Sequence, residues 1–521
     1  MPDSAASREW WREAVFYQIY PRSFQDSNGD GVGDLPGIIS RLDYLHDLGI
    51  DALWISPFYR SPMADFGYDV ADYCDVDPVF GTLADFDRLL AGAHERGIRV
   101  IVDFVPNHSS DQHPWFIDAR SSRTSEHRDW YVWADPKPDG SPPNNWRSTF
   151  ARFGPAWTLD ERTGQYYLHS FAPQQPDLNW WNPKVRAAMD AALRFWLDRH
   201  VDGFRIDVAH MMARDPELRD TPVLVDGSER PATSDWPGVH DILRSFRRTI
   251  DSYPDRMAVG EVWLGDMAAI ARYYGERSDE LHMAFNFFFF FQPWQASAFR
   301  GSVDMFESAL PPGAWPDYTL SNHDQSRPAS RYDREGLGQA RARLAAMMLL
   351  TLRGTPFLYY GEELGMTDVP IPPELARDPD GRDPYRTPMQ WDASPHAGFT
   401  TGTPWLPVSP SYARVNAGAE LAEPTSLLNL YRRLLHLRRS SEALRLGSYT
   451  PVELGEGIFA YLRQAGAERL LVILNFKNEA WRLSLGQLAP SAELMISTQD
   501  RAAISLQQLE LAANEGLLLR L

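Results

Sequence analysis

Cysteine is almost absent from this sequence of 521 residues, which contains one, Cys74. A single cysteine excludes an internal disulfide and fits a reducing compartment. It lies in Tyr73-Cys74-Asp75-Val76, which carries no motif of a nucleophilic thiol. We therefore expect Cys74 to act as a small buried apolar residue.

Long apolar runs are also missing. The most apolar window, residues 285–291, is interrupted by Asn286 and is far shorter than a transmembrane helix. Residues 1–10 lack the basic start and apolar stretch of a secretory signal. These two observations predict a cytoplasmic protein without a membrane partner.

Basic residues are outnumbered by acidic ones, 51 to 70, which gives a net charge of −19. This balance argues against nucleic acid as a partner. A hydrophobic content of 44% with 12% aromatic residues excludes a mainly disordered chain. The length predicts two or three domains, or one large barrel with attachments.

An amphipathic helix, a stop signal and an apolar strand follow one another repeatedly. Gly49 and Gly97 separate helix from strand in the first two units, and Asn182-Pro183 caps and starts the helix of a third. Continuously apolar strands in this alternation predict a parallel sheet. Eight strands close a β/α barrel, and the pattern predicts them near residues 14–20, 50–56, 98–104, 203–207, 258–261, 282–287, 318–321 and 355–360.

Two stretches break this rhythm. Residues 105–178 are rich in Pro, Trp, Ser and Asp, with a short hairpin at 166–170, and read as a subdomain inserted after the third strand. Beyond residue 446 the chain alternates short strands, which indicates a small all-β domain. We predict an α/β fold with a (β/α)8 TIM barrel at 1–104 and 179–440, an inserted subdomain at 105–178 and a C-terminal β-sandwich domain at 441–521.

Three acidic residues, Asp207, Glu261 and Asp324, stand at the ends of apolar runs. A buried unpaired charge is costly, so strand formation does not call for an acid there. In a barrel of parallel strands, however, the C-terminal strand ends carry the chemistry. The alternative is that these acids only pair with Arg205 and Arg327.

Seven motifs stand out along the chain. Four are Asp103-Phe104-Val105-Pro106-Asn107-His108, Gly203-Phe204-Arg205-Ile206-Asp207, Gly260-Glu261-Val262-Trp263 and Ser321-Asn322-His323-Asp324; the others are Gln175-Pro176-Asp177-Leu178-Asn179-Trp180, Gly361-Glu362-Glu363-Leu364-Gly365-Met366 and Arg386-Thr387-Pro388-Met389-Gln390-Trp391-Asp392. The first four, in order, resemble the signature regions of the α-amylase family of glycoside hydrolases. The fifth resembles a region of its oligo-1,6-glucosidase and α-glucosidase branch, and the last two are typical of that branch.

The resemblance implies cleavage of a glycosidic bond with retention of configuration. Asp207 would be the nucleophile, Glu261 the acid/base, and Asp324 would stabilise the transition state and bind sugar hydroxyls. Retaining enzymes hold the two reacting carboxyl groups roughly 5–5.5 Å apart. Glu261 would have to carry a proton near neutral pH. Arg205 points to the same strand face as Asp207 and is expected to keep it ionised and oriented.

The resemblance also implies a closed sugar pocket. Asp65 would hold the non-reducing-end hydroxyls of the terminal glucose, Tyr68 would stack on its ring, and Arg386 would fork onto Asp65. A closed pocket admits only chain ends and so implies exo action. The alternative is a surface Asp–Arg pair beside a packed tyrosine.

Other side chains are expected around this pocket. We predict that His108 and His323 donate hydrogen bonds to the sugar and that Asp103 is a structural partner of Arg205. Phe150 and Phe171 would be walls of the pocket or, equally, core residues.

A glycine-rich loop places oxygen donors at alternate positions. This spacing suits a hard cation such as Ca²⁺, although Gly37 stands where an EF-hand has its bidentate Glu. The α-glucosidase branch carries a similar structural metal loop; Mg²⁺ or a metal-free turn stay open. The expected ligands are Asp26, Asn28, Asp30, the Val32 carbonyl and Asp34.

Val208 bears on linkage. Valine directly after the nucleophile is associated with α-1,6-acting members of the branch, but Ala209-His210 departs from their usual pattern. We expect activity on both α-1,4 and α-1,6 linkages.

The predicted function is an exo-acting, retaining α-glucosidase for disaccharides and short gluco-oligosaccharides, as a monomer or homodimer. A transglucosylase or sucrose isomerase on the same scaffold is the first alternative. A non-catalytic sugar-binding or transporter-associated homologue is the second, although such relatives typically lose catalytic acids and gain a membrane segment.

Overall fold

The computed structural model describes residues 9–225, 228–488, 491–499, 501 and 503–521, so most of the segment inspected for a signal lies outside it. Within these residues, eight parallel strands form one sheet in the order β13-β12-β9-β5-β2-β1-β15-β14. The strands are β1 (Phe16–Ile19), β2 (Ala52–Ile55), β5 (Arg99–Phe104), β9 (Gly203–Ile206), β12 (Met257–Gly260), β13 (Met283–Ala284), β14 (Asp317–Thr319) and β15 (Thr355–Tyr359).

The sheet closes into a near-barrel, with β13 and β14 at its two edges. At this seam the Asn286 backbone N–H donates to Asp317 Oδ1 at 3.2 Å. The predicted TIM barrel is confirmed, and each predicted strand overlaps an observed one. The sixth strand is shorter than predicted, because helix α9 (Phe287–Phe290) begins soon after β13. A run of phenylalanines suits a buried helix as well as a buried strand, so the pattern could not separate them.

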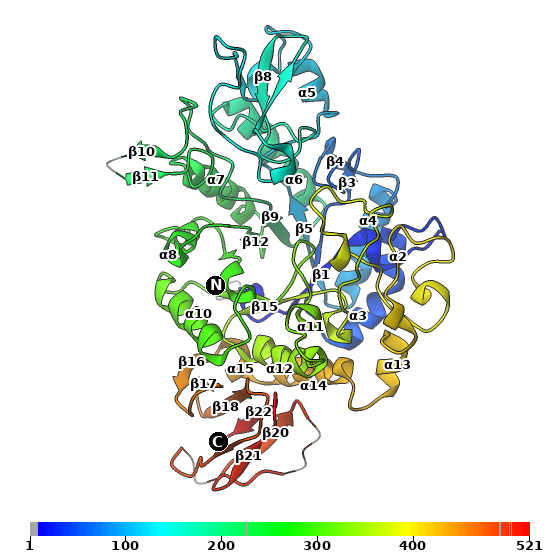
Figure 1. Ribbon diagram of the computed structural model, residues 1–521, viewed down its shortest axis with the longest axis vertical. Coiled ribbons are helices and arrows are strands. Elements are labelled where there is room, and N and C mark those ends of the chain that lie inside the picture. The colour runs from blue at the N-terminus through cyan, green and yellow to red at the C-terminus, as the bar shows by residue number, and fades with distance from the viewer. Residues whose placement is uncertain (1–8, 226–227, 489–490, 500, 502) are drawn as a thin grey trace, which may run out of the picture.

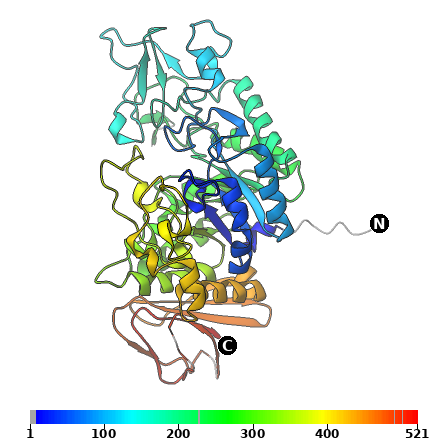
Figure 2. The same cartoon turned by 90° about the vertical axis from the view of Figure 1, so that its right-hand side faces the viewer.

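Helices flank the barrel strands, as Figures 1 and 2 show. The predicted helix start at Asn182 is confirmed, because its side chain accepts from the Lys184 N–H. The Thr82 side chain starts a second helix in the same way by accepting from the Asp85 N–H. The first predicted helix, the one that ends before Gly49, is two helices that meet at Arg41. The helices are α1 (Pro21–Phe24), α2 (Leu35–Ser40), α3 (Leu42–Leu48), α4 (Leu83–Glu95), α6 (Pro183–Asp198), α7 (Val239–Asp251), α8 (Met267–Ala271), α10 (Ala296–Ala309), α11 (Pro328–Arg331) and α12 (Gly338–Thr351).

The insertion between β5 and α6 forms its own layer at the top of Figure 1. It contains α5 (Pro114–Ala119) and a three-stranded sheet in the order β6-β8-β7, formed by Trp133–Ala134, Gln165–Leu168 and Trp157–Asp160. The observed hairpin pairs β7 with β8, so the one predicted at 166–170 is misplaced: of that range only 166–168 lies in the hairpin, at the end of β8. A bridge between His108 and Asp177 joins the two ends of the insertion, so both ends return to the barrel rim.

The C-terminal part lies at the opposite end of the molecule (Figure 1). A five-stranded sheet in this part contacts α12 of the barrel. The Tyr461 hydroxyl of the sheet lies 2.6 Å from Thr351 Oγ1, and Arg463 donates to the Thr351 carbonyl at 2.5 Å. Its elements are α13 (Ala417–Ala422), α14 (Leu427–Ser440), α15 (Glu442–Leu446), a sheet in the order β16 (Ser448–Val452), β17 (Ile458–Ala465), β18 (Glu468–Asn475), β22 (Gly516–Arg520) and β20 (Glu493–Ser497), and the pair β19 (Trp481–Leu483) and β21 (Leu509–Leu511).

Two small hairpins complete the chain. One, β3 (Tyr59–Arg60) with β4 (Asp72–Val76), follows the second barrel strand; the other, β10 (Val223–Val225) with β11 (Ser228–Arg230), follows the fourth. Both extend loops at the C-terminal ends of the barrel strands.

Candidate active site

A cavity of about 500 Å³ lies at the C-terminal ends of the barrel strands. Asp207, directly after β9, Glu261, directly after β12, and Asp324, after β14, all line it. The structure therefore brings the three predicted catalytic carboxylates together. A larger groove of about 890 Å³ lies between α14 and the C-terminal sheet, but Asp47 is the one carboxylate among its described lining residues.

Arg205 on β9 is the hub of the carboxylates. Its Nη1 donates to Asp207 Oδ1 at 2.6 Å and to Asp103 Oδ1 at 2.7 Å, and its Nη2 donates to Glu261 Oε2. The predicted bond between Asp103 and Arg205 is confirmed. The Arg205 side chain is 1% exposed, so its ion pairs are shielded from water. One guanidinium thus holds three carboxyl groups in a fixed arrangement.

This arrangement carries more negative than positive charge, which favours retention of a proton. Burial raises the pKa of Asp103 to about 6. Burial also raises the pKa of Asp207 well above its usual range; Arg205 opposes this, while Glu261 and Asp103 add to it. Sequence analysis predicted an ionising effect of Arg205, but desolvation and the two neighbouring carboxylates outweigh it.

Glu261 is held by three N–H donors. Oε2 accepts from Arg205 and, at 3.1 Å, from the Val208 backbone N–H, and Oε1 accepts from Trp263 Nε1 at 2.5 Å. Val208 has φ of 34°, a left-handed conformation that is rare for a β-branched residue. The turn after Asp207 is thereby bent so that its backbone reaches the second carboxylate.

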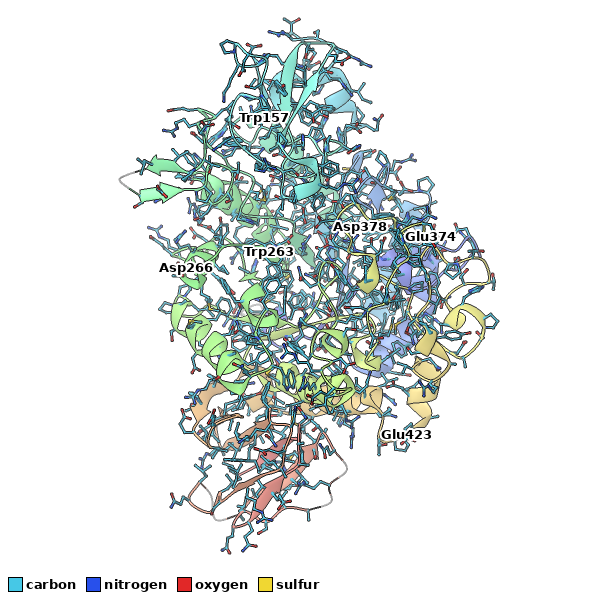
Figure 3. All side chains as sticks on the ribbon, viewed as in Figure 1. Trp157, Trp263, Asp266, Glu374, Asp378 and Glu423 are labelled. Atoms are coloured by element: carbon cyan, nitrogen blue, oxygen red, sulfur yellow. The ribbon has the colours of Figure 1, made fainter. Side chains whose placement is uncertain are left out.

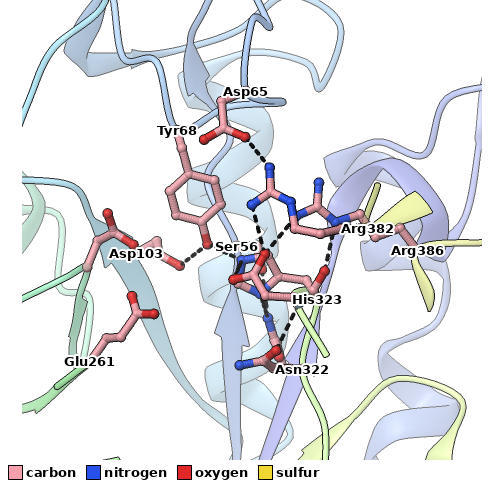
Figure 4. Close-up of polar contacts among 12 residues, drawn as sticks. Ser56, Asp65, Tyr68, Asp103, Glu261, Asn322, His323, Arg382 and Arg386 are labelled. Carbon is pink, nitrogen blue, oxygen red and sulfur yellow. Dashed lines mark hydrogen bonds and ion pairs between the residues drawn. The ribbon is translucent and has the colours of Figure 1, made fainter. Parts of the chain in front are cut away.

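Tyr68 and His323 form a buried polar pair beside these acids, shown in Figure 4. The Tyr68 hydroxyl lies 2.7 Å from His323 Nε2 and donates to Asp103 Oδ2 at 3.2 Å, and the two rings stack at 5.3 Å. Burial lowers the pKa of His323 to about 3, so its ring is neutral. Tyr68 is thus locked in orientation by its own neighbours.

Asp324 lies between two arginines, Arg382 and Arg386, both of which Figure 4 labels. Its Oδ1 accepts from Arg386 Nη2 at 2.8 Å and from Arg382 Nη1 at 3.0 Å. Burial works against its charge, but the two neighbouring cations, Arg382 and Arg386, prevail and hold the pKa of Asp324 below its usual range. Asp324 is therefore an anion.

The predicted partner of Asp65 is wrong. Arg382, not Arg386, donates to Asp65 Oδ1, while Arg386 donates to Asp324, to Asp378 and to the His323 carbonyl. The two arginines stand four residues apart in one irregular segment, and sequence alone could not decide which of them reaches the cavity.

The remaining predicted residues form the side of the cavity that faces the insertion. His108, Phe150 and Phe171 all line it and are nonetheless buried. His108 contacts the Phe171 ring at 5.2 Å, and Phe150 lies 5.0 Å from the Arg382 guanidinium. Both earlier readings of the phenylalanines hold, because each ring packs in a cluster and also faces the cavity.

Comparison with known proteins matches this architecture. Residues 18–447 match the family model "Alpha amylase, catalytic domain", and residues 458–517 match "Alpha-amylase SusG C-terminal domain". The chain belongs to the α-amylase family. It is a glycoside hydrolase.

Individual relatives within the α-amylase family span almost the whole chain. It is 45% identical to a probable α-glucosidase of Rhizobium meliloti, over 91% of this chain and 90% of that protein. It is 41% identical to an oligo-1,6-glucosidase of Parageobacillus thermoglucosidasius, over 95% of both chains. The crystal structure of a trehalulose synthase from Pseudomonas mesoacidophila superposes with a TM-score of 0.91 at 38% identity, covering 98% of this chain and 99% of that one.

Sequence reasoning missed several residues that this α-amylase-family site uses. Gln175 donates to Asp65 Oδ2 at 3.0 Å, and Arg382 and Trp263 contact cavity carboxylates directly. Gln175 and Trp263 stood inside quoted motifs, and their amide and indole N–H groups were the available signal. No sequence signal pointed to Arg382, because it lies in a loop away from the barrel strands and outside the quoted motifs.

The loop predicted to bind a metal contains oxygen atoms that could act as ligands, but its carboxylates do not form one compact cluster. Asp26 accepts from the backbone N–H groups of Asn28, Gly29 and Gly31, and Asp30 accepts from the Val32 N–H. Carboxylate oxygens have further lone pairs, so these bonds leave room for a cation.

Within the described ranges, however, no three His, Cys, Asp or Glu side chains gather closely enough to hold a metal. A cation in this loop would need the Asn28 amide oxygen and the Val32 carbonyl as well. The Asp34 side chain, the last expected ligand, caps α2 by accepting from the Gly37 N–H. The metal site stays a prediction.

Two further expectations concern Cys74 and membranes. Cys74 is half-buried rather than buried as expected, and burial raises the pKa of its thiol to about 11, so the thiol is neutral near pH 7. In the part of the chain that the structure describes, no helix has both the length and the apolar character to cross a bilayer.

Proposed function

We propose that this protein is a retaining, exo-acting α-glucosidase, which releases terminal non-reducing α-linked glucose from disaccharides and short oligosaccharides. The observation that carries the proposal is the pairing of Asp207 and Glu261 on one Arg205 guanidinium in a cavity whose far side is closed by Asp65 and Arg382. The first pair supplies the chemistry. The second limits which part of a sugar chain can enter.

Asp207 is the proposed nucleophile and Glu261 the proposed acid/base. Attack by Asp207 on the anomeric carbon requires its carboxylate form, so the proton held among these carboxyl groups has to reside on Glu261 when the bond is cleaved. Glu261 then gives the proton to the departing oxygen, and a covalent glucosyl–Asp207 intermediate forms. Water, deprotonated by Glu261, releases the glucose. The short link through Arg205 supports the close spacing that retention needs.

Asp324 is the proposed transition-state stabiliser. Its ionised carboxylate lies opposite the positive charge that develops at the anomeric carbon. Arg382 and Arg386 fix its Oδ1, while His323 Nε2 lies 3.1 Å from Oδ2. Arg382, Arg386 and His323 are all buried, which keeps the Asp324 carboxylate in one place.

Exo action is supported by the end of the cavity. Asp65 is 3% exposed and is fixed by Arg382 and Gln175. The Phe150 ring covers Arg382 from the side of the insertion. A chain that continued past a terminal glucose would have to break these bonds, so the geometry favours chain ends.

Both α-1,4 and α-1,6 linkages are proposed as substrates. Val208 and His210 line the cavity beside Glu261, on the side where the leaving sugar would lie. Val208 gives this wall an apolar side chain and His210 gives it a polar one.

Side-by-side glucose release from maltose, isomaltose and sucrose tests the proposal, with Asp207→Asn as the inactive control. Glucose from maltose or isomaltose supports the proposed function. If the pure protein releases glucose from none of the three, the proposal fails.

A transglucosylase or sucrose isomerase is the second candidate, supported by the high similarity to the trehalulose synthase structure. The two functions share every catalytic residue and differ in whether water or a sugar captures the glucosyl intermediate. Product analysis at high substrate concentration separates them: free glucose supports hydrolysis, whereas new disaccharides from sucrose support isomerisation.

A structural Ca²⁺, or Mg²⁺, in the loop of Asp26, Asn28, Asp30, Val32 and Asp34 is proposed on the donor set. The loop is braced from outside, since the Thr400 hydroxyl donates to Asp26 and the Trp405 N–H donates to the Gly31 carbonyl. A cation would add charge balance to three carboxylates in a tight turn. The catalytic steps do not involve it.

A further inference from the structure

Trp263, which Figure 3 labels near the middle of the molecule, lies two residues after Glu261 and lines the cavity. Its indole Nε1–H donates to Glu261 Oε1 at 2.5 Å. The ring stacks on Phe287 at 4.3 Å with an angle of 22° between planes, and it contacts the Phe291 ring at 5.6 Å. With 36% of its surface exposed, Trp263 is both fixed by aromatic neighbours and open to the cavity.

The two oxygens of Glu261 have different partners. Oε2 accepts from the Arg205 guanidinium and from the Val208 N–H, and Trp263 is the partner that the structure gives Oε1. All three partners can donate but cannot accept. A proton on Oε2 would meet two donors, one of them a full positive charge, so Oε1 is the oxygen that can carry the proton needed for cleavage.

We propose that Trp263 is a positioning residue that controls when Glu261 is protonated. Its N–H donates to Oε1 before substrate binds. The glycosidic oxygen of the substrate has to take the place of this N–H beside Oε1 before Oε1 can deliver its proton. The inference rests on the proposed acid/base role of Glu261.

The balance of the step is simple. The Oε1–H bond breaks as its proton passes to the glycosidic oxygen, the bond from that oxygen to the anomeric carbon breaks, and Asp207 forms a new bond to the same carbon. In the second half, the water oxygen bonds to the anomeric carbon, the bond from that carbon to Asp207 breaks, and the proton that the water loses returns to Oε1. The Trp263 N–H exchanges no proton and acts only by bonding to the charged form of Glu261.

A hydrogen bond to a carboxylate favours the ionised form over the protonated one. Loss of the Trp263 N–H should therefore allow Glu261 to keep its proton to higher pH. Bonds to charged groups have strengths that correspond to a shift of about one pH unit or slightly more.

The sharpest test replaces Trp263 with β-(3-benzothienyl)alanine, which keeps the two fused rings and puts sulfur in place of N–H. The dependence of kcat/KM on pH is measured on the best glucoside of the unmodified enzyme. We expect the alkaline limb to move up by about one pH unit. A limb that stays within about 0.2 pH unit of the original overturns the inference, because the packing is unchanged and only the donor is lost.

Two variants separate the donor from the ring. Trp263→Phe should show the same shift of the alkaline limb, together with a further loss of kcat/KM from lost ring area. Phe291→Leu removes a ring that touches Trp263 but makes no bond to Glu261, and its limb should stay in place. An equal shift in Phe291→Leu would assign the effect to packing and overturn the inference.

A second readout does not depend on turnover. In protein with ¹³C-labelled Glu carboxyl groups, with the Glu261 signal assigned by Glu261→Gln, the titration midpoint of Glu261 should rise by about one pH unit in the benzothienyl protein. An unchanged midpoint overturns the inference even where glucosidase activity is present. An unmodified protein that titrates as expected but cleaves no glucoside would refute the proposed function alone.

Discussion

Asp317→Asn should stabilise the protein at alkaline pH. Asp317 begins β14 at the seam of the barrel and is fully buried. Its Oδ1 accepts from the Asn286 N–H, whereas its Oδ2 has no hydrogen-bond partner among the described residues. Burial raises the pKa of Asp317 from 3.8 to about 7, because a carboxylate there is desolvated and has one donor to compensate.

The sign and size follow from proton linkage. Between about pH 4 and pH 7 the folded protein binds this proton and the unfolded chain does not, so the free energy of unfolding falls as pH rises. Above pH 7 the loss is complete, and a difference of about three pKa units corresponds to about 4 kcal/mol. Asparagine has nearly the same shape, accepts the same bond from Asn286 and does not titrate.

The assay is thermal unfolding of both proteins at pH 4.5 and pH 8. For 521 residues, about 1 kcal/mol changes Tm by about 1 °C. We expect similar Tm values at pH 4.5 and a variant that is more stable by about 3 °C at pH 8. The exposed Glu335→Gln is the control and should show no such widening. If the gap between Asp317→Asn and the parent is the same at both pH values, the desolvation argument is refuted.

The other predictions concern the site and the loop. Asp207→Asn and Glu261→Gln should each lower kcat by about 10⁴-fold or more with an unchanged circular dichroism spectrum; retained turnover in either would remove its assigned role. Arg382→Gln should lower kcat/KM by about 10²-fold, mainly through KM, because Asp65 and Asp324 lose a shared donor, and an unaltered KM would argue against the closed pocket. Chelation should lower Tm by about 2–3 °C while kcat/KM measured at 25 °C stays constant; Asp26→Asn should abolish this sensitivity, and elemental analysis without Ca²⁺ or Mg²⁺ would contradict the loop prediction.

The site shows where residue patterns stop being informative. Asp65, Tyr68, His108 and His323 were found from local motifs, whereas Phe150 and Phe171 were left open between pocket wall and core. All six line or flank one cavity. The partner of Asp65 was predicted wrongly, as Arg386 instead of Arg382. Both arginines lie in a segment with a short 3-10 turn, where no periodic apolar pattern fixes the direction of a side chain.

Local sequence by itself determined the order of elements and the position of the acids along them. Apolar runs that end at Asp207 and Glu261 define both a buried strand and its polar end, and caps such as Thr82 and Asn182 fix helix starts through bonds within four residues. These features depend on short-range geometry, so they can be read without the fold.

Tertiary structure decided how strongly these charges act on one another and that Glu261 shares the same arginine. Arg205 meets Asp103, Asp207 and Glu261 only because three separate strands lie side by side in the barrel. The raised pKa of Asp207 depends on the water that these neighbours exclude and on the charges they bring. Desolvation and long-range pairing are properties of the packed interior, and no spacing along the chain records them.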